Sequence, residues 1–220
     1  MMMQAIQKAD TGSYQSDNRF RALLGDSAWA GLPEAVQARF GKRLRAGMSV
    51  TYQGEVTAMR FSIMGWILAQ ILRPVGAPLP YDVSSVGQAA VVVVTEDGST
   101  GGQFWIRQYS RAAGFPQVVH SSKRFRGVTG LEEYIGYGIG MALRIRAAPS
   151  SLIFESDHYF FEALGLRLRL PRWLTPGALE IGHHDEGTGC FRFSLRLTHS
   201  LFGEVLSQDA VFRDAGPHHA

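Results

Sequence analysis

Residues 131–146 read Leu-Glu-Glu-Tyr-Ile-Gly-Tyr-Gly-Ile-Gly-Met-Ala-Leu-Arg-Ile-Arg. Apolar side chains alternate with small or polar ones, and this period of two predicts a β-strand. The apolar face carries one carboxylate, Glu133, which is costly to bury unless it is paired. The other face carries Gly136, Gly138 and Gly140, which indicate sharp curvature or close approach of another group. These features are typical of a barrel around a ligand cavity. A curved sheet packed on a helix, with Glu133 paired to an arginine, is the alternative.

Composition places the chain among ordinary globular proteins. It has 220 residues, enough for one large or two small domains, and 45% of them are hydrophobic and 19% charged. The net charge is +3, but the arginines are scattered, so we expect no nucleic-acid partner. Cys190 is the single cysteine, which excludes an intrachain disulfide. Because the first ten residues also lack the apolar core of a secretory signal, we expect a cytoplasmic protein.

Strand-like segments recur along the chain and are joined by short turns. They lie at 49–59, 88–96, 103–109, 117–125, 131–146, 152–161, 166–170, 178–183, 190–198 and 204–212. Among these ten segments we count seven to nine strands, and their tight turns predict a mainly β fold, in which one antiparallel sheet is curled or closed into a lipocalin-like (calycin-like) β-barrel. With no linker or repeat in view, we expect one domain over 18–213, between disordered tails at 1–17 and 214–220.

Helices are expected before the first strand and as one insertion. Residues 19–24 and a segment starting at Leu32-Pro33-Glu34 show helix signals, because proline and an acid both favour the first turn. Residues 61–72 are nearly all apolar and would span about 18 Å as a helix, too short to cross a bilayer. We expect this inserted helix to be buried. The alternative is that it docks on a membrane surface, which makes peripheral membrane contact through 61–72 a candidate interaction.

Several short motifs follow one another in a distinctive order between about residues 19 and 213. They are Leu24-Gly25, Trp29, Leu32-Pro33, Tyr52-Gln53-Gly54-Glu55, Trp105-Ile106-Arg107, Ser121, Glu133 with Gly136, Leu170-Pro171-Arg172-Trp173-Leu174-Thr175-Pro176, and Glu180. In this order they resemble the bacterial family of unknown function numbered 4166. Domains of that family are often fused to reductase-like domains, so the resemblance implies a role in small-molecule metabolism. It supplies no catalytic residue, and the chain departs from the family pattern at 136–140 and 108–110.

The candidate ligand-binding residues are Trp105, Arg107, Tyr109 and Tyr137. The first three share one strand face, where an arginine between two aromatic rings can hold a carboxylate or phosphate. Tyr137 lies on the same predicted face as Glu133. If these faces point inward, Arg107 is the natural partner for Glu133. The alternative is an interior ion pair that only fixes the barrel.

The candidate catalytic residues are Glu133 and His158. His158 follows Phe154 and Ser156 on an apolar strand face. A histidine there is most often a satisfied core residue, but its pKa near neutrality also suits a general acid or base. Histidines with metal-binding spacing are absent, and the segment 183–186 (His-His-Asp-Glu) is expected at a solvated turn. We therefore expect neither a metal nor another cofactor.

Together these observations predict a barrel that binds a hydrophobic or amphipathic small-molecule metabolite in its interior. Such a barrel could also catalyse a cofactor-free cyclisation or isomerisation, with Glu133 or His158 moving protons and Arg107 orienting an anionic group. The alternative is a non-catalytic lipid carrier or a protein-interaction module. A cavity of roughly 300 Å³ or more would favour ligand binding, and a filled interior would favour the interaction module. The sequence leaves the ligand, the catalytic activity and the oligomeric state open.

Overall fold

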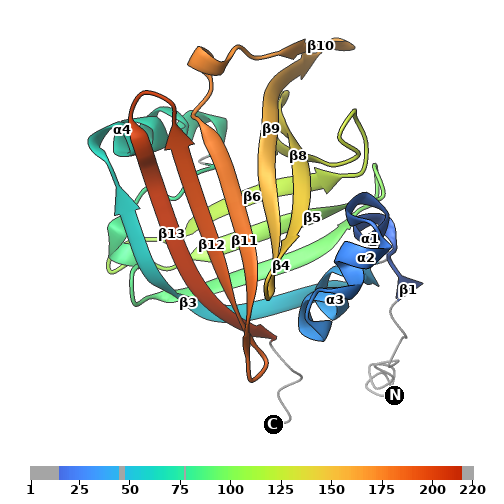
Figure 1. Cartoon of the computed structure of the whole chain (residues 1–220). Helices are drawn as coiled ribbons and strands as arrows, with labels where there is room; N and C mark the ends of the chain where they lie inside the picture. Colours follow the sequence, from blue (N-terminus) through green and yellow to red (C-terminus); the bar gives the residue numbers. More distant parts are fainter. Residues whose placement is uncertain (1–14, 45–47, 77, 215–220) are drawn as a thin grey trace, which may run out of the picture.

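The computed structural model describes residues 15–44, 48–76 and 78–214, and antiparallel strands make up most of them (Figure 1). The strands of the main sheet are β3 (Ser49–Phe61), β4 (Ala89–Asp97), β5 (Gly102–Tyr109), β6 (Gln117–Arg124), β7 (Glu132–Gly136), β8 (Ile139–Ala148), β9 (Ser151–Ala163), β10 (Leu166–Arg169), β11 (Ala178–Gly187), β12 (Cys190–His199) and β13 (Gly203–Asp214).

The sheet closes into a ten-stranded barrel. The strands follow the order β9, β11, β12, β13, β3, β4, β5, β6, β7 and β8, and β8 then pairs with β9 to complete the circle. Strand β10 pairs only with β9 and extends beyond the closed wall. The mainly β, barrel-like fold predicted from the sequence is therefore confirmed, with N-terminal helices and one inserted helix.

Three short helices cover one end of the barrel, at the lower right of Figure 1. They are α1 (Arg19–Leu24), α2 (Asp26–Ala30) and α3 (Glu34–Phe40), and the sequence patterns had not indicated α2. Phe40 of α3 is buried and packs against the rings of Trp105, Phe154 and His183. The helices therefore fill this end with apolar side chains.

The structure describes three residues of the expected tail 1–17, namely 15–17. Strand β1 (Gln15–Ser16) pairs with β2 (Lys42–Arg43), and Asp17 is buried with its carboxylate bound by Arg19. Residues 15–17 of the expected tail are therefore part of the described fold. The rest of the two expected tails, 1–14 and 215–220, lies outside the described residues.

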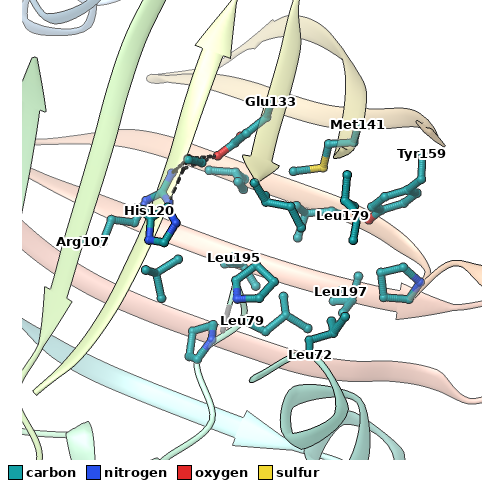
Figure 2. Close-up of a pocket in the computed structure, with 18 of the residues that line it drawn as sticks. Leu72, Leu79, Arg107, His120, Glu133, Met141, Tyr159, Leu179, Leu195 and Leu197 are labelled. Atoms are coloured by element: carbon teal, nitrogen blue, oxygen red, sulfur yellow. Dashed lines mark hydrogen bonds and ion pairs between the residues drawn. The ribbon is translucent and has the colours of Figure 1, made fainter. Parts of the chain in front are cut away.

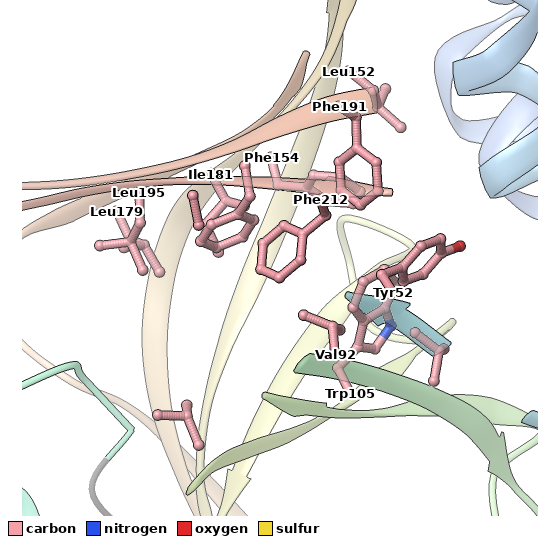
Figure 3. Packing of buried hydrophobic residues seen from close by; sticks show 14 of the residues in the cluster. Tyr52, Val92, Trp105, Leu152, Phe154, Leu179, Ile181, Phe191, Leu195 and Phe212 are labelled. Carbon is pink, nitrogen blue, oxygen red and sulfur yellow. The ribbon is translucent and has the colours of Figure 1, made fainter. Parts of the chain in front are cut away.

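Strand alternation decides which side chains enter the barrel. On β5, Trp105, Arg107 and Tyr109 are buried. Phe104 and Ile106, which alternate with them, are partly exposed on the outer wall. Figure 3 shows Trp105 meeting side chains from several other strands, among them Tyr52, Phe191 and Phe212. The half of the interior next to α1–α3 is thus filled by aromatic residues.

The stretch 131–146 is a hairpin, which corrects the expectation of one long strand. It divides into β7 and β8, with Gly136, Tyr137 and Gly138 at the turn, all at positive φ. Two glycines suit such a turn because they adopt positive φ without steric cost. Gly140 has a different role, since a Cβ there would lie 2.5 Å from the ring of Phe160. The glycine face therefore marks a turn and a close contact, not a cleared patch inside the barrel.

A β-bulge in β9 changes which residues face inward. Ala142 pairs with His158 and Leu143 with Ser156, so Asp157 is the extra residue. A bulge of this kind shifts the alternation by one position. As a result Tyr159 lines the interior, whereas His158 and Phe160 lie on the outer wall. The expectation that His158 shares a face with Phe154 was therefore wrong.

The inserted helix α4 (Ile63–Ile71) covers the other end of the barrel at the upper left of Figure 1. It packs on β13 and β3, and Ser62 caps it by accepting a hydrogen bond from the backbone N–H of Gly65. Its outer side is open: Ile63 is 84% exposed and Trp66 54%. The expectation that this apolar helix is buried was therefore correct for only one side. Within the described residues, no helix is long and apolar enough to cross a bilayer.

Close packing of α4 on β13 depends on Gly65, where a Cβ would lie 1.7 Å from the carbonyl oxygen of Val205. We expect Gly65→Ala to push the helix off the strand and to lower the free energy of unfolding by about 1–3 kcal/mol. Gly31→Ala is the control, because its Cβ would meet only ordinary contacts at 3.6 Å. Urea denaturation of the two variants measures the difference, and equal stabilities would contradict this packing.

Candidate functional site

A cavity of about 180 Å³ occupies the half of the barrel interior away from α1–α3 (Figure 2). Leu72, Pro78, Leu79 and Pro80 cover it from the segment after α4, and Leu170, Leu174 and Pro176 cover it from the β10–β11 connection. The wall is mostly apolar, with Val119, Ile135, Ile139, Met141, Leu179, Ile181, Phe193, Leu195 and Leu197. The polar lining residues are Arg107, Tyr109, His120, Ser121, Glu133 and Tyr159.

A buried ion cluster lies at one wall of this cavity. One carboxylate oxygen of Glu133 accepts hydrogen bonds from Ser121 Oγ at 2.5 Å and Arg107 Nη2 at 3.2 Å. The other accepts from Lys123 Nζ at 2.8 Å. All four residues are buried. They come from the adjacent strands β5, β6 and β7, where Lys123 lies directly opposite Glu133, so the register of the sheet sets the geometry.

The cluster keeps Glu133 ionised. Burial alone raises the pKa of this carboxyl, but the charges of Lys123 and Arg107, with hydrogen bonds from Lys123 and Ser121, outweigh burial and bring the pKa to about 2. Burial lowers the pKa of Lys123, and the charge of Glu133 partly opposes that shift. The Lys123 ammonium also lies 5.2 Å from the centre of the Trp105 ring. With Lys123 protonated, two cations face one carboxylate.

Two tyrosines add hydroxyl groups to the cavity wall. Burial raises the pKa of Tyr109 to about 12, although the charge of Arg107 opposes this shift. Burial also raises the pKa of Tyr159. Both side chains therefore remain protonated near neutral pH and can donate hydrogen bonds.

The structure brings together only part of the predicted site. Arg107, Tyr109 and Glu133 line the cavity, and the predicted pairing of Arg107 with Glu133 is present. Trp105 is buried in the neighbouring, filled part of the interior. Tyr137 lies at the β7–β8 turn, 71% exposed and away from the cavity.

His158, the second predicted catalytic residue, lies outside the barrel. It borders a groove of about 390 Å³ on the outer wall, together with Arg169, Arg172 and His199. Its Nδ1 is 2.7 Å from Oδ2 of Asp157. It is therefore not positioned to exchange protons with a ligand in the interior.

The sequence reasoning missed Lys123 and misplaced His183. Alternation from Val119 puts Ser121 and Lys123 on the same inward face, so Lys123 could have been found from the pattern. His183 was expected near a solvated turn, but β11 continues to Gly187 and buries this histidine among aromatic rings. Desolvation holds its pKa well below the usual value. No group of three or more potential metal ligands occurs among the described residues.

Residues 32–212 match the family described as a domain of unknown function (DUF4166). The chain belongs to this family. The resemblance inferred from the order of short motifs is therefore confirmed for the DUF4166 domain. Comparison with curated proteins and with solved structures gives no match.

Replacing Glu133 with Gln leaves two buried cations without their carboxylate. We expect Glu133→Gln to lower the free energy of unfolding by about 3–5 kcal/mol. The control is Glu155→Gln, since Glu155 pairs with Arg146 on the exposed outer wall and its loss should cost under about 1 kcal/mol. Chemical denaturation at pH 7 measures both.

Acid provides a second readout of the same cluster. The pKa of Glu133 is about 2 in the folded protein and about 4.3 in an unfolded chain. The contribution of ionised Glu133 to the free energy of unfolding is therefore complete above about pH 4.3 and is lost as the pH falls towards about 2. Glu133→Gln should lack this part of the acid destabilisation. If the wild type and Glu133→Gln lose stability equally between about pH 4.3 and about pH 2, Glu133 is not held in this ion cluster.

Proposed function

We propose that the barrel binds a small amphipathic acid, with its apolar body in the cavity and its carboxylate at Arg107. The observation that carries this proposal is the position of the ion cluster, in which two cations and one carboxylate meet at the wall of an apolar cavity. The closed barrel is compatible with ligand binding.

The charges of the cluster favour an anionic ligand. An uncompensated cation is costly in a medium of low dielectric constant, and a second carboxylate would balance the cluster. Arg107 has capacity for it, because its hydrogen bonds to Ser121 and Glu133 measure 3.2–3.3 Å. Charge-assisted bonds are usually nearer 2.7–2.9 Å. The guanidinium is therefore only loosely held by its protein partners.

The size of the cavity limits the ligand. At about 180 Å³ it is smaller than the roughly 300 Å³ at which typical small-molecule pockets begin. It is slightly larger than the roughly 150 Å³ cavity that holds benzene in an engineered protein. This comparison supports a ligand of roughly ten non-hydrogen atoms, such as a short-chain or single-ring acid.

Tyr109 and Tyr159 can help to hold the polar end of such a ligand. Both line the cavity, and both keep their protons because burial raises their pKa. A phenolic hydroxyl donates a hydrogen bond to a carboxylate without adding another charge. Their rings also contribute apolar surface to the wall.

Binding fits the site better than proton-transfer catalysis. A carboxylate with a pKa of about 2 is a weak base near neutral pH, and both oxygens of Glu133 already accept hydrogen bonds. His158 borders the outer groove instead of the cavity. We therefore propose a binding protein and do not extend the proposal to cyclisation or isomerisation.

Octanoate and 1-octanol provide a test, because they differ mainly in charge. We expect the protein to bind octanoate more tightly, with a negative heat-capacity change from apolar burial. Arg107→Gln should weaken octanoate binding by about 1.5–3 kcal/mol, the worth of a hydrogen bond to a charged group, and leave octanol binding nearly unchanged. Isothermal titration calorimetry measures both ligands.

The matched control is Arg213→Gln, which changes an exposed arginine on the outside of β13. It should bind octanoate as the wild type does. Equal losses for octanoate and octanol in Arg107→Gln would contradict a carboxylate at Arg107. Absence of measurable binding of either compound to the wild type would overturn the proposed ligand class.

A further inference from the structure

Large apolar side chains protrude from three separate segments at one end of the barrel. This is the end covered by α4, opposite α1–α3 (Figure 1). The segments are α4, the short helix η3 (Arg172–Leu174) and the turn between β12 and β13. Exposed apolar residues on these segments include Ile63, Trp66, Ile71, Trp173, Leu201 and Phe202, and we call these six the α4-end surface.

Strand pairing places these segments together. Leu206, near the start of β13, pairs with Phe61, which lies two residues before α4. Ala178 at the start of β11 pairs with Thr198 near the end of β12, so η3 also reaches this end. Exposed apolar residues from three connections therefore meet there. An exposed apolar patch of this kind on a protein surface marks an interaction site.

Arginines accompany the apolar residues. Arg73 follows α4, and Arg169 and Arg172 flank the connection that carries Trp173; all three are exposed. In the part of the chain that the structure describes, no carboxylate lies within 4.0 Å of their guanidinium groups. Asp157, which borders the same groove, is already bound to Arg144 and His158, and Glu204 is an exposed carboxylate nearby on β13. The end therefore presents more available cations than anions.

We propose that the α4-end surface docks on an anionic lipid bilayer. Tryptophan is favoured at the membrane–water interface, and arginines beside it attract anionic headgroups. Ile63, Ile71 and Leu201 are aliphatic, so they can enter the acyl boundary as one side of an interfacial helix does. A lipid surface accommodates residues from three separate segments without a matching shape, whereas a protein partner would need one.

The cavity lies beneath the same end. Leu72 and Leu174 line it from the two connections that cover it, and Leu174 is also exposed. A sparingly soluble acid could thus pass between the bilayer and the cavity without crossing water. This last step depends on the proposed function, whereas docking itself does not.

Flotation with vesicles tests the docking. We expect the protein to float with vesicles of phosphatidylcholine and phosphatidylglycerol, and more weakly with phosphatidylcholine alone. Ile63→Asp should reduce binding at least tenfold, because it introduces a carboxylate beside the headgroups. Val128→Asp is the control, since Val128 is 92% exposed in the β6–β7 connection at the opposite end. It should float as the wild type does.

The charge contribution has its own pair of variants. Arg169→Gln combined with Arg172→Gln should weaken binding to the anionic vesicles about thirtyfold, as expected for two basic residues near the surface. Arg213→Gln should leave binding unchanged. The proposal is overturned if the wild type does not float, or if the α4-end variants and their controls behave alike. Octanoate titration without vesicles separates failure of docking from failure of the ligand site.

Discussion

The rest of this structure depends on the pairing of β8 with β9, which closes the sheet. Closure removes the free strand edges and separates an interior from solvent. Every inward side chain must then pack or line a cavity. Next to α1–α3 the aromatic residues pack, and Phe40 completes that half. In the other half the inward residues are mainly aliphatic and leave a space of about 180 Å³. Closure together with the distribution of aromatic residues therefore positions the cavity.

Closure also explains the charge balance of Glu133. Its two cationic partners come from β5 and β6. In the low-dielectric interior that closure creates, each of these charged side chains is stabilised by the opposite charge of its partner. One carboxylate between Arg107 and Lys123 leaves the cluster positively charged when Lys123 is protonated. A structural ion pair alone would need only one cation. The second cation, and the apolar cavity that Arg107 lines, therefore support the proposed anion site over an ion pair that only fixes the barrel.

The fold was largely predictable from the sequence, and the site only in part. Period-two alternation located nearly every strand, and it correctly placed Arg107 and Glu133 inside because β5 is regular throughout and β7 is regular up to Tyr134. Alternation fails where the backbone departs from it. The bulge at Asp157 turned His158 outward, and the turn at Gly136–Gly138 removed Tyr137 from the interior. A single sequence does not show where a strand breaks, since glycine is typical both of a bulge and of a turn. Lys123 was overlooked for a different reason: lysine is rarely fully buried.

The two ends of the barrel carry helices of opposite character, and this difference links the interior to the surroundings. Phe20, Trp29 and Phe40 of α1–α3 all point into the core, so that end is a plug. Helix α4 buries Gly65 and Ala69, packs Met64 and Leu68 partly against the core, and turns Ile63, Trp66 and Ile71 outward. A helix that only closed the barrel would be more stable with those side chains buried and polar ones exposed. Apolar residues on both sides of α4 instead suit a cover that lies on the barrel on one side and contacts an apolar environment on the other. Since the cavity lies beneath this cover, the proposed ligand would have an apolar path to it at the α4 end and none at the plugged end.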